Sequence, residues 1–483
     1  MQLFLTSEKM KKIIVYLALS VAFSVHSQEI QWASKLIKFS SDLGGKQNGI
    51  KRILGKPDVF PQGGSSPNAW SPKNALDGKE VVEVGFEKPQ TIKQIAIFEN
   101  LNAGCVVKVS VDNGSGKYET VWSRKPNWQT PVYKSTFAAD RSYYFGRKRR
   151  KIEKAPEVNL NPGIEYIFLE KEVANGIALK IEFNFALLHG QKQIDAIGIS
   201  NSALPIQPTI NEISFSDKIQ EVEVVPLKGF YPSSPVISKD GKKLIFSSLS
   251  DEKEEVFICQ KGSDGKWSNP TKEETLSQNS YYNYIEHYGN DFILKGGIGY
   301  NKGTQESGYE ILKLQSEHYQ SQGALKIAAY NNYDETSEAT ISSDGTILIL
   351  GIETDFTHGG SDLYFSKKKE DGTFGFLQNM GKMINSAADE GMPQLLSDNK
   401  TIVFSTNGFS GYGEYDIYVS YRLDETWKNW SEPQNLGKKI NSNDFDGLPF
   451  YDERDEKLYF IQAIDGIQYL KQVTIPKSDL MKS

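Results

Sequence analysis

The sequence is poor in the residues that build metal centres. Its 483 residues include two cysteines and five histidines. Metal sites in proteins use clustered His, Cys and carboxylate ligands. Beyond the first 27 residues, no histidine lies within four positions of another; these histidines are His189, His287, His318 and His358. We therefore predict no metal site.

The sequence also lacks the motifs of nucleophilic and nucleotide-dependent enzymes. It contains no Gly-x-Ser-x-Gly elbow and no Gly-x-x-x-x-Gly-Lys-Ser/Thr phosphate loop. Ser410 stands in a glycine-rich segment, GFSGYG, but a turn between two strands requires the same composition. The sequence therefore predicts a protein that is not an enzyme and that uses no cofactor.

Long apolar runs are limited to one, Ile13–Val25, which follows Lys11 and Lys12 and precedes the small residue Ser27. A basic start, an apolar run of about 7–15 residues and a small residue at the cut are typical of a secretory signal. The run is shorter than the roughly 20 residues of a membrane-spanning helix. No cysteine follows the expected cut, so we predict an exported protein, soluble without residues 1–27 and not a lipoprotein.

The charge balance disfavours nucleic acid as a partner. Without residues 1–27 the chain carries 52 basic and 60 acidic residues, which gives a net charge of −8. Proteins that bind nucleic acids need a strongly basic face. This chain is expected to bind other partners.

The two cysteines, Cys105 and Cys259, stand in separate apolar stretches that read as strands, CVVKVSV and EVFICQK. A disulfide between them is conceivable in an oxidising compartment. We expect two buried free thiols instead.

Repeats dominate the second half of the chain, where glycine and aromatic residues suit strands and tight turns. An Asp-led turn precedes an apolar strand five times, in steps of 51, 53, 54 and 57 residues; the positions are Asp240, Asp291, Asp344, Asp398 and Asp455. One such unit cannot bury both faces of its own small sheet. Stacked four-stranded units of about this period are typical of a β-propeller.

Five repeats predict five blades, or six if two short units have been merged. The last repeat ends near Val473 with only three strands. The segment around Val222–Leu227 precedes the first repeat, and we expect it to supply the fourth strand of the final blade. This would cover an open sheet edge and join the two ends of the ring.

Acidic residues return at equivalent places in the repeats; they are Glu286, Glu335, Asp362, Glu390, Asp416 and Asp446. A ring of carboxylates could bind Ca²⁺. Recurrence in successive units instead favours a structural role, in which Asp and Glu hold turns by hydrogen bonds.

Residues 28–204 contain no repeat and read as an antiparallel β-sandwich. Alternation of apolar and polar residues is clear in VVEVGFE and CVVKVSVD. Turn signals such as Asp77-Gly78 separate the runs. The expected organisation is a signal peptide (1–27), a sandwich (28–204) and a propeller (205–478), an all-β fold class.

Both halves resemble known families. The stretches SPVISKDGKKLIFSS and GMPQLLSDNKTIVFSTNG are similar to the WD40-like propeller repeats of TolB and of OmpA-family envelope proteins of Bacteroidetes. The stretches GKPDVFPQGGSSPNAWSP and ALKIEFNFALLHGQKQIDAIGI resemble discoidin-like, galactose-binding jelly rolls. These resemblances imply binding but identify no ligand, and this sequence shows no OmpA-like domain after the propeller, so peptidoglycan anchoring is not carried over.

Candidate binding residues come from segments without close copies in the other repeats and from exposed-looking aromatic or basic groups. In the propeller they are Tyr281, Tyr282, Tyr284, His287 and His358. In the sandwich they are Trp70 and Trp128, with Arg147, Arg149 and Arg150 in the basic insertion GRKRRK. Aromatic residues favour interfaces and a basic run favours an anionic partner, but core packing and a solvated loop remain the alternatives.

The sequence predicts a non-enzymatic scaffold of the bacterial cell envelope, periplasmic or at the cell surface. Its expected partners are envelope proteins, such as those of an outer-membrane assembly or of type 9 secretion machinery. One alternative is a carbohydrate-binding protein that uses the sandwich loops. A second is an enzyme, such as a lyase, with its site in the propeller channel.

Overall fold

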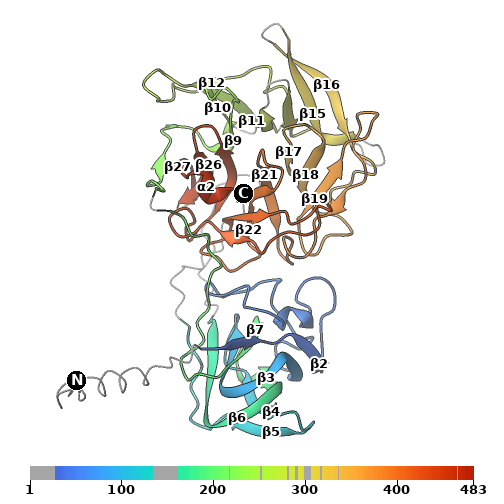
Figure 1. Ribbon diagram of the computed structural model, residues 1–483, viewed down its shortest axis with the longest axis vertical. Coiled ribbons are helices and arrows are strands. Elements are labelled where there is room, and N and C mark those ends of the chain that lie inside the picture. Colours follow the sequence, from blue (N-terminus) through green and yellow to red (C-terminus); the bar gives the residue numbers. More distant parts are fainter. Residues whose placement is uncertain are drawn as a thin grey trace, which may run out of the picture.

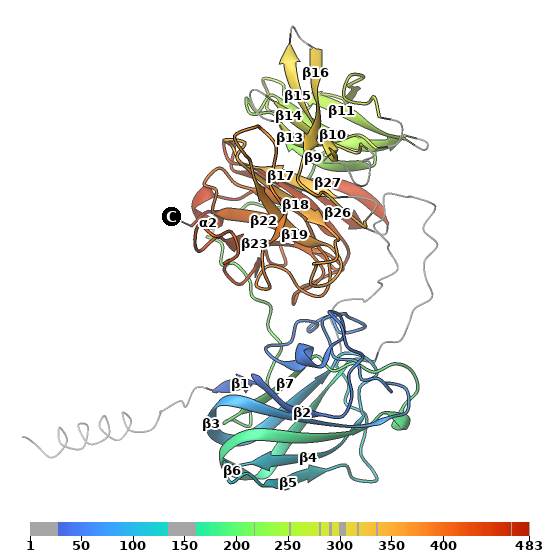
Figure 2. The same cartoon turned by 90° about the vertical axis from the view of Figure 1, so that its right-hand side faces the viewer.

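The computed structural model of the chain shows two all-β domains (Figure 1). It describes residues 28–133, 161–216, 218–250, 253–279, 282–288, 292–298, 306–315, 318–334, 337–464 and 466–482. The strands of the first domain, β1–β7, gather at one end of the molecule, and those of the second domain at the other (Figures 1 and 2).

The first domain is a β-sandwich built around two long strands. Its strands are β1 (Ile30–Trp32), β2 (Lys35–Phe39), β3 (Lys79–Glu99), β4 (Val106–Asp112), β5 (Tyr118–Ser123), β6 (Gly163–Asn184) and β7 (Ala196–Ser200). Two 3₁₀ turns, η1 (Ile50–Ile53) and η2 (Phe185–Leu187), accompany them. The strand order is β1-β7-β3-β6-β4-β5, and β2 also pairs with β3.

The long strands β3 and β6 belong to both layers of the sandwich. Their antiparallel register shifts three times between Gly85 and Gln94. The first half of β3 pairs with β2, and the second half pairs with β7. Since irregularities of this kind bend a strand, the two halves can face each other across one apolar core, in which Val82, Val84 and Trp70 are buried.

The second domain consists of five four-stranded antiparallel sheets. Blade 1 contains β9 (Pro232–Ile237), β10 (Lys243–Ser250), β11 (Lys253–Gln260) and β12 (Thr271–Lys272). Blade 2 contains β13 (Tyr284–Tyr288), β14 (Ile293–Gly296), β15 (Glu306–Gln315) and β16 (His318–Lys326). Blade 3 contains β17 (Glu338–Ile341), β18 (Ile347–Ile352), β19 (Asp362–Lys367) and β20 (Gln378–Asn379).

Blade 4 contains β21 (Glu390–Leu395), β22 (Thr401–Thr406), β23 (Asp416–Tyr421) and β24 (Gln434–Asn435). Blade 5 contains β25 (Asp446–Asp452), β26 (Lys457–Ile464), β27 (Ile467–Thr474) and β8 (Glu223–Val224), and the short helix α2 (Lys477–Leu480) follows. The first strands of successive blades touch in the order β9, β13, β17, β21, β25 and again β9. This closed ring confirms the five-bladed propeller.

The ring is closed by a strand from the opposite end of the domain. In blade 5, Lys471 and Gln472 of β27 pair with Val224 and Glu223 of β8. The pairing follows the expectation from the sequence, although the strand is shorter than the segment 222–227. Cys105 and Cys259 lie buried and free in separate domains, as expected.

Three inner strands carry the same irregularity. Ser234, Met392 and Leu448 have positive φ angles of 43°, 55° and 52°, and each precedes a proline. The ladder to the neighbouring strand shifts register close to each of them. Proline is tolerated here because the inner strand is an edge strand, so no ladder hydrogen bond is lost.

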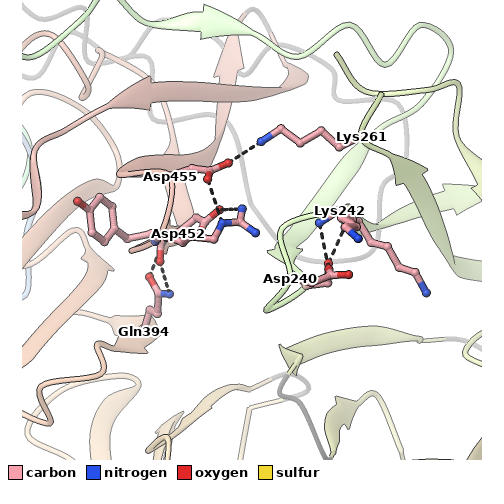
Figure 3. Close-up of polar contacts among 10 residues, drawn as sticks. Asp240, Lys242, Lys261, Gln394, Asp452 and Asp455 are labelled. Atoms are coloured by element: carbon pink, nitrogen blue, oxygen red, sulfur yellow. Dashed lines mark hydrogen bonds and ion pairs between the residues drawn. The ribbon is translucent and has the colours of Figure 1, made fainter. Parts of the chain in front are cut away.

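Polar contacts also join blade 5 to blade 1, as Figure 3 shows. Lys261 of blade 1 pairs with Asp455 of blade 5 at 2.5 Å, and Arg454 donates to Asp452 and Asp455 at 2.9 Å. A Cβ added to Gly241, which has φ +68°, would overlap the Arg454 guanidinium. The Asp-Gly turn of blade 1 therefore provides the surface on which Arg454 lies.

This contact predicts a larger cost for Gly241→Ala than for Gly345→Ala. Both glycines occupy Asp-Gly turns with almost equal φ angles, +68° and +70°, but no atom lies within 4 Å of a Cβ at Gly345. The strain of a left-handed alanine, about 1 kcal/mol, is then common to both variants. Urea denaturation should show an additional loss of about 0.5–1 kcal/mol for Gly241→Ala. The excess should vanish when both variants also carry Arg454→Ala; an excess that persists would contradict the role of Arg454.

Candidate functional site at the joint between the domains

The site begins with buried carboxylates that hold the propeller loops facing the sandwich. In blade 3, Asp362 Oδ2 accepts hydrogen bonds from His358 N at 2.7 Å and Asn379 Nδ2 at 2.5 Å. In blade 4, Asp416 Oδ2 accepts them from Tyr412 N at 2.5 Å and Asn435 Nδ2 at 2.9 Å. The two blades thus fix their loops with the same pair of residue types.

In blades 4 and 5 a carboxylate also holds the turn that leads into the inner strand. Glu390 accepts from Ser386 N at 2.8 Å, and Asp446 accepts from Ser442 N at 2.5 Å. In blade 2, Glu286 accepts from Ala339 N of the next blade at 3.1 Å. The bonds of Glu390 and Asp446 hold turns, whereas the bond of Glu286 joins blade 2 to strand β17 of blade 3. Glu335 lies outside the described residues.

Burial raises the pKa of these carboxyl groups. Loss of water is the main cause in each: the pKa rises to about 6 for Asp362, about 7 for Asp416 and about 8 for Glu390, and well above the usual range for Asp446. Hydrogen bonds to each group oppose the rise without cancelling it. Burial therefore favours the protonated form of all four groups.

The sandwich places an asparagine against two of these loops. Asn68 is 1% exposed, and its Oδ1 accepts from Ala387 N at 2.8 Å. Its Nδ2 donates to Gly408 O at 2.7 Å and to Ser386 Oγ at 3.4 Å. The carboxamide is therefore satisfied as acceptor and as donor by blade 4 alone.

Further contacts between side chains and backbone surround Asn68. Lys46 Nζ donates to Asp355 O at 2.7 Å, Gln47 Nε2 to Ala387 O at 3.4 Å, Gln62 Nε2 to Gly413 O at 2.9 Å and Ser410 Oγ to Pro57 O at 2.6 Å. Lys56 and Glu432 form an exposed ion pair at 3.4 Å. In Figure 2 the loops that follow β2 face the propeller. One end of the sandwich is thus committed to the propeller.

Charged groups of both domains meet at the joint. Burial lowers the pKa of Arg52, and the carboxylates of Asp58, Glu390 and Asp362 oppose this effect. Burial raises the pKa of Asp58 to about 7, while Arg52 acts to lower it and Glu432 to raise it. Arg52 of the sandwich therefore interacts with two buried carboxyl groups of the propeller, and Lys46 also lowers the pKa of Asp362.

The aromatic candidates of the sandwich lie in different surroundings. Trp70 is fully buried in the sandwich core, where its ring lies 5.9 Å from that of Phe183. Trp128 is half-buried; Arg124 lies 4.0 Å above its ring and its Nε1 donates to Glu165 at 3.3 Å. Trp70 has the placement of a core residue, the alternative that the sequence left open.

The propeller candidates divide between two blades. Tyr284 is buried, and its hydroxyl donates to Ser337 O at 3.1 Å. His287 stacks on Phe292 at 5.2 Å, and burial lowers its pKa to about 4. His358 is half-buried at the joint; burial lowers its pKa, as do the charges of Lys382, Arg52 and Lys46.

Tyr282 is half-buried. Tyr281, Arg147, Arg149 and Arg150 lie outside the described residues. The structure does not bring the sandwich tryptophans and the blade 2 residues into one site. Among the described candidates, His358 is the one that adjoins the joint.

The residues that form the joint, above all Asn68, Arg52 and Asp58, are not among those predicted from the sequence. Asn68 and Asp58 lie in GKPDVFPQGGSSPNAWSP, a stretch that resembles part of a ligand-binding jelly roll. The several prolines and glycines of this stretch do indicate a long ordered loop. They do not indicate which part of the protein the loop contacts.

Within the part of the chain that the structure describes, no three His, Cys, Asp or Glu side chains are grouped to hold a metal ion. The described helices include none that is both long and apolar enough to span a membrane.

Comparisons of the chain with known proteins find similar solved structures. No family model matches it, and no curated protein matches it. Similar solved structures include TolB from Acinetobacter baumannii, with 12% identity and a TM-score of 0.32. The match covers 50% of this chain and 54% of that TolB chain.

Two further similar structures are named as enzymes. One is oligogalacturonate lyase from Vibrio parahaemolyticus (13% identity, TM-score 0.30, covering 55% of this chain and 97% of that one). The other is a gluconolactonase from Xanthomonas campestris (10% identity, TM-score 0.31, covering 57% of this chain and 99% of that one). At TM-scores and identities this low, the similarity supports no inference about this chain. The five-bladed fold is established by the strand pairing.

The raised pKa values predict that the folded state loses stability as pH rises. A carboxyl whose pKa is higher in the folded than in the unfolded chain contributes its full stabilisation at a pH below the pKa of the unfolded state. This contribution is lost as the pH rises through the pKa of the folded state. For Glu390 the window runs from 4.5 to about 8. Urea denaturation should therefore give a lower free energy of unfolding at pH 8.5 than at pH 5.5.

Glu390→Gln supplies the matched control, because glutamine keeps the shape and an acceptor oxygen but does not ionise. The variant should lose less stability than the wild type between the two pH values. An equal loss in both proteins would show that Glu390 does not titrate in this window.

Proposed function

We propose that this protein is a non-enzymatic binding protein that acts as a scaffold in a bacterial cell envelope. The observation that carries the proposal is the joint between the domains. Contacts such as those of Asn68 and Gln62 fix the sandwich on the loops of blades 3 and 4. The two domains, each of a fold that is used for binding, are thereby held in a fixed orientation. A fixed orientation suits a protein that brings partners together.

The carboxyl groups of the propeller support a structural use of its acidic residues. Asp362, Asp416, Glu390 and Asp446 all accept backbone N–H groups and are no more than 1% exposed. General acid–base catalysis requires a group within reach of a substrate proton. Residues committed to loops in this way are better suited to shaping a surface than to proton transfer.

Export to the envelope rests on the secretory pattern of residues 1–27. The resemblance of the repeats to those of TolB and of Bacteroidetes envelope proteins favours the same location. We further propose an accessory role in an outer-membrane assembly or in type 9 secretion machinery.

Carbohydrate binding by the sandwich is the second candidate. The favouring observation is the cluster of Trp128, Arg124 and Glu165, which combines an aromatic ring with polar groups. The sandwich loops around Asn68 are covered by the propeller, so a glycan would use this other part of the domain.

A crosslinked pull-down from the native envelope tests the scaffold role. The tagged chain without residues 1–27 should recover a defined set of envelope proteins, as mass spectrometry would show. Trp128→Ala should recover the same set, because the proposed role does not depend on this ring. Recovery of no protein, together with retention on a glycan array that Trp128→Ala abolishes, would replace the scaffold by the carbohydrate-binding role.

A further inference from the structure

Among the residues that the structure describes, the joint between the domains has no shared apolar core. Each described hydrophobic cluster belongs to one domain: two lie in the sandwich and five in the propeller. The hydrogen bonds described across the joint run from side chains to backbone groups or between polar side chains. Because apolar burial supplies most of the free energy of a permanent interface, polar contacts of this kind are suited to reversible separation.

At the centre of the joint, blade 4 forms a cradle for a carboxamide, made of Ser386, Ala387 and Gly408. The backbone N–H of Ala387 donates to the amide oxygen of Asn68, while Gly408 O and Ser386 Oγ accept from its nitrogen. A carboxylate of the same shape could not donate to Gly408 O. The cradle is therefore chemically selective for Asn over Asp.

The cradle is rigid independently of the sandwich. Ser386 donates to Glu390 through its backbone N–H at 2.8 Å and its hydroxyl at 2.7 Å. Thr406 Oγ1 donates to the same carboxyl at 2.9 Å and accepts from Gly408 N at 2.8 Å. Both sides of the cradle are thus connected through one buried carboxyl, which preorganises it for binding.

Glycine is required at position 408. A Cβ there would overlap Ser386 Oγ and come within 2.6 Å of Glu390 Oε1. Blade 5 keeps the Ser–carboxylate pair as Ser442 and Asp446, but Ile464 stands at the position that corresponds to Gly408. Blade 5 therefore keeps the loop-holding bonds without the features that recognise an amide.

We propose that this cradle is a recognition site for the asparagine side chain of an exposed loop on a partner protein, and that Asn68 occupies it in cis as a displaceable stand-in. The inference deepens the proposed scaffold function and rests on it. The sandwich then acts as a cap over blade 4. Because the linker keeps Asn68 at a high effective concentration, a partner must add contacts beyond the amide to displace the cap.

A peptide of residues 62–72, labelled with a fluorophore, probes the cradle directly. The receptor is the full chain without residues 1–27, either wild-type or with Asn68→Ala. Fluorescence anisotropy should show binding to the Asn68→Ala chain at least ~10-fold tighter than to the wild type, whose cradle is filled. A peptide with Asp at position 68 should bind the variant at least ~10-fold more weakly than the Asn peptide.

Two variants serve as controls. Gln62→Ala removes a neighbouring contact of the cap but leaves Asn68 in the cradle, so it should bind the peptide no better than the wild type. Gly408→Ala, added to Asn68→Ala, should abolish peptide binding. Circular dichroism would verify that each chain remains folded.

Amide hydrogen exchange of residues 386–389 and 407–413 reports whether the cap has opened. Faster exchange in Asn68→Ala without binding of the Asn peptide would overturn the recognition site. If these segments stay protected even when Lys46→Ala and Gln47→Ala are added, the cap is not displaceable and the proposal also fails. Because the peptide assay needs no envelope partner, a negative pull-down would refute the scaffold function while leaving the cradle result intact.

Discussion

The capture of backbone N–H groups by buried carboxyls is the interaction on which the loops of the propeller depend. A blade of four short strands leaves long connections that have no sheet partners of their own. In blades 3 and 4 the same solution appears, since Asp362 and Asp416 each hold a loop through a backbone N–H and an asparagine amide. An unpaired carboxyl at these depths would be costly, and the hydrogen bonds offset that cost while they fix the loops that the sandwich meets.

The same arrangement links stability to function. Glu390 is buried, so its pKa is high, and its hydrogen bonds organise Ser386 and Thr406 on the two sides of the cradle. The group that holds the turn therefore also shapes the surface beside it. A substitution of Glu390 would act on folding and on the joint together, which is why a neutral isostere is the informative change.

Much of the architecture could be predicted from the sequence because it is repeated. Five Asp-led turns predicted five blades, with six left open, and a leftover strand at the start of the domain indicated the closure by β8. The predicted turn-holding role agrees with the hydrogen bonds of four of the recurring acids, namely Asp362, Glu390, Asp416 and Asp446. The aromatic candidates were harder, because the sequence does not tell whether a tryptophan such as Trp70 faces a core or solvent. The joint could not be foreseen at all: Asn68 and Gly408 are 340 positions apart, and no local pattern connects them.

Closure by β8 has a consequence for the order in which the chain acquires structure. The strands of the sandwich end at Ser200, and Ile206 completes one of its apolar clusters, so its contacts lie within the first part of the chain. The propeller ring, in contrast, pairs residues 223–224 with residues 471–472, so its seam forms only after nearly the whole domain is available. Until then β8 and the inner edge of blade 1 lack their partners, and the folded sandwich lies next to an unfinished ring. Asn68 can then reach its cradle only after blade 4 is assembled, which makes docking of the cap a late event in folding.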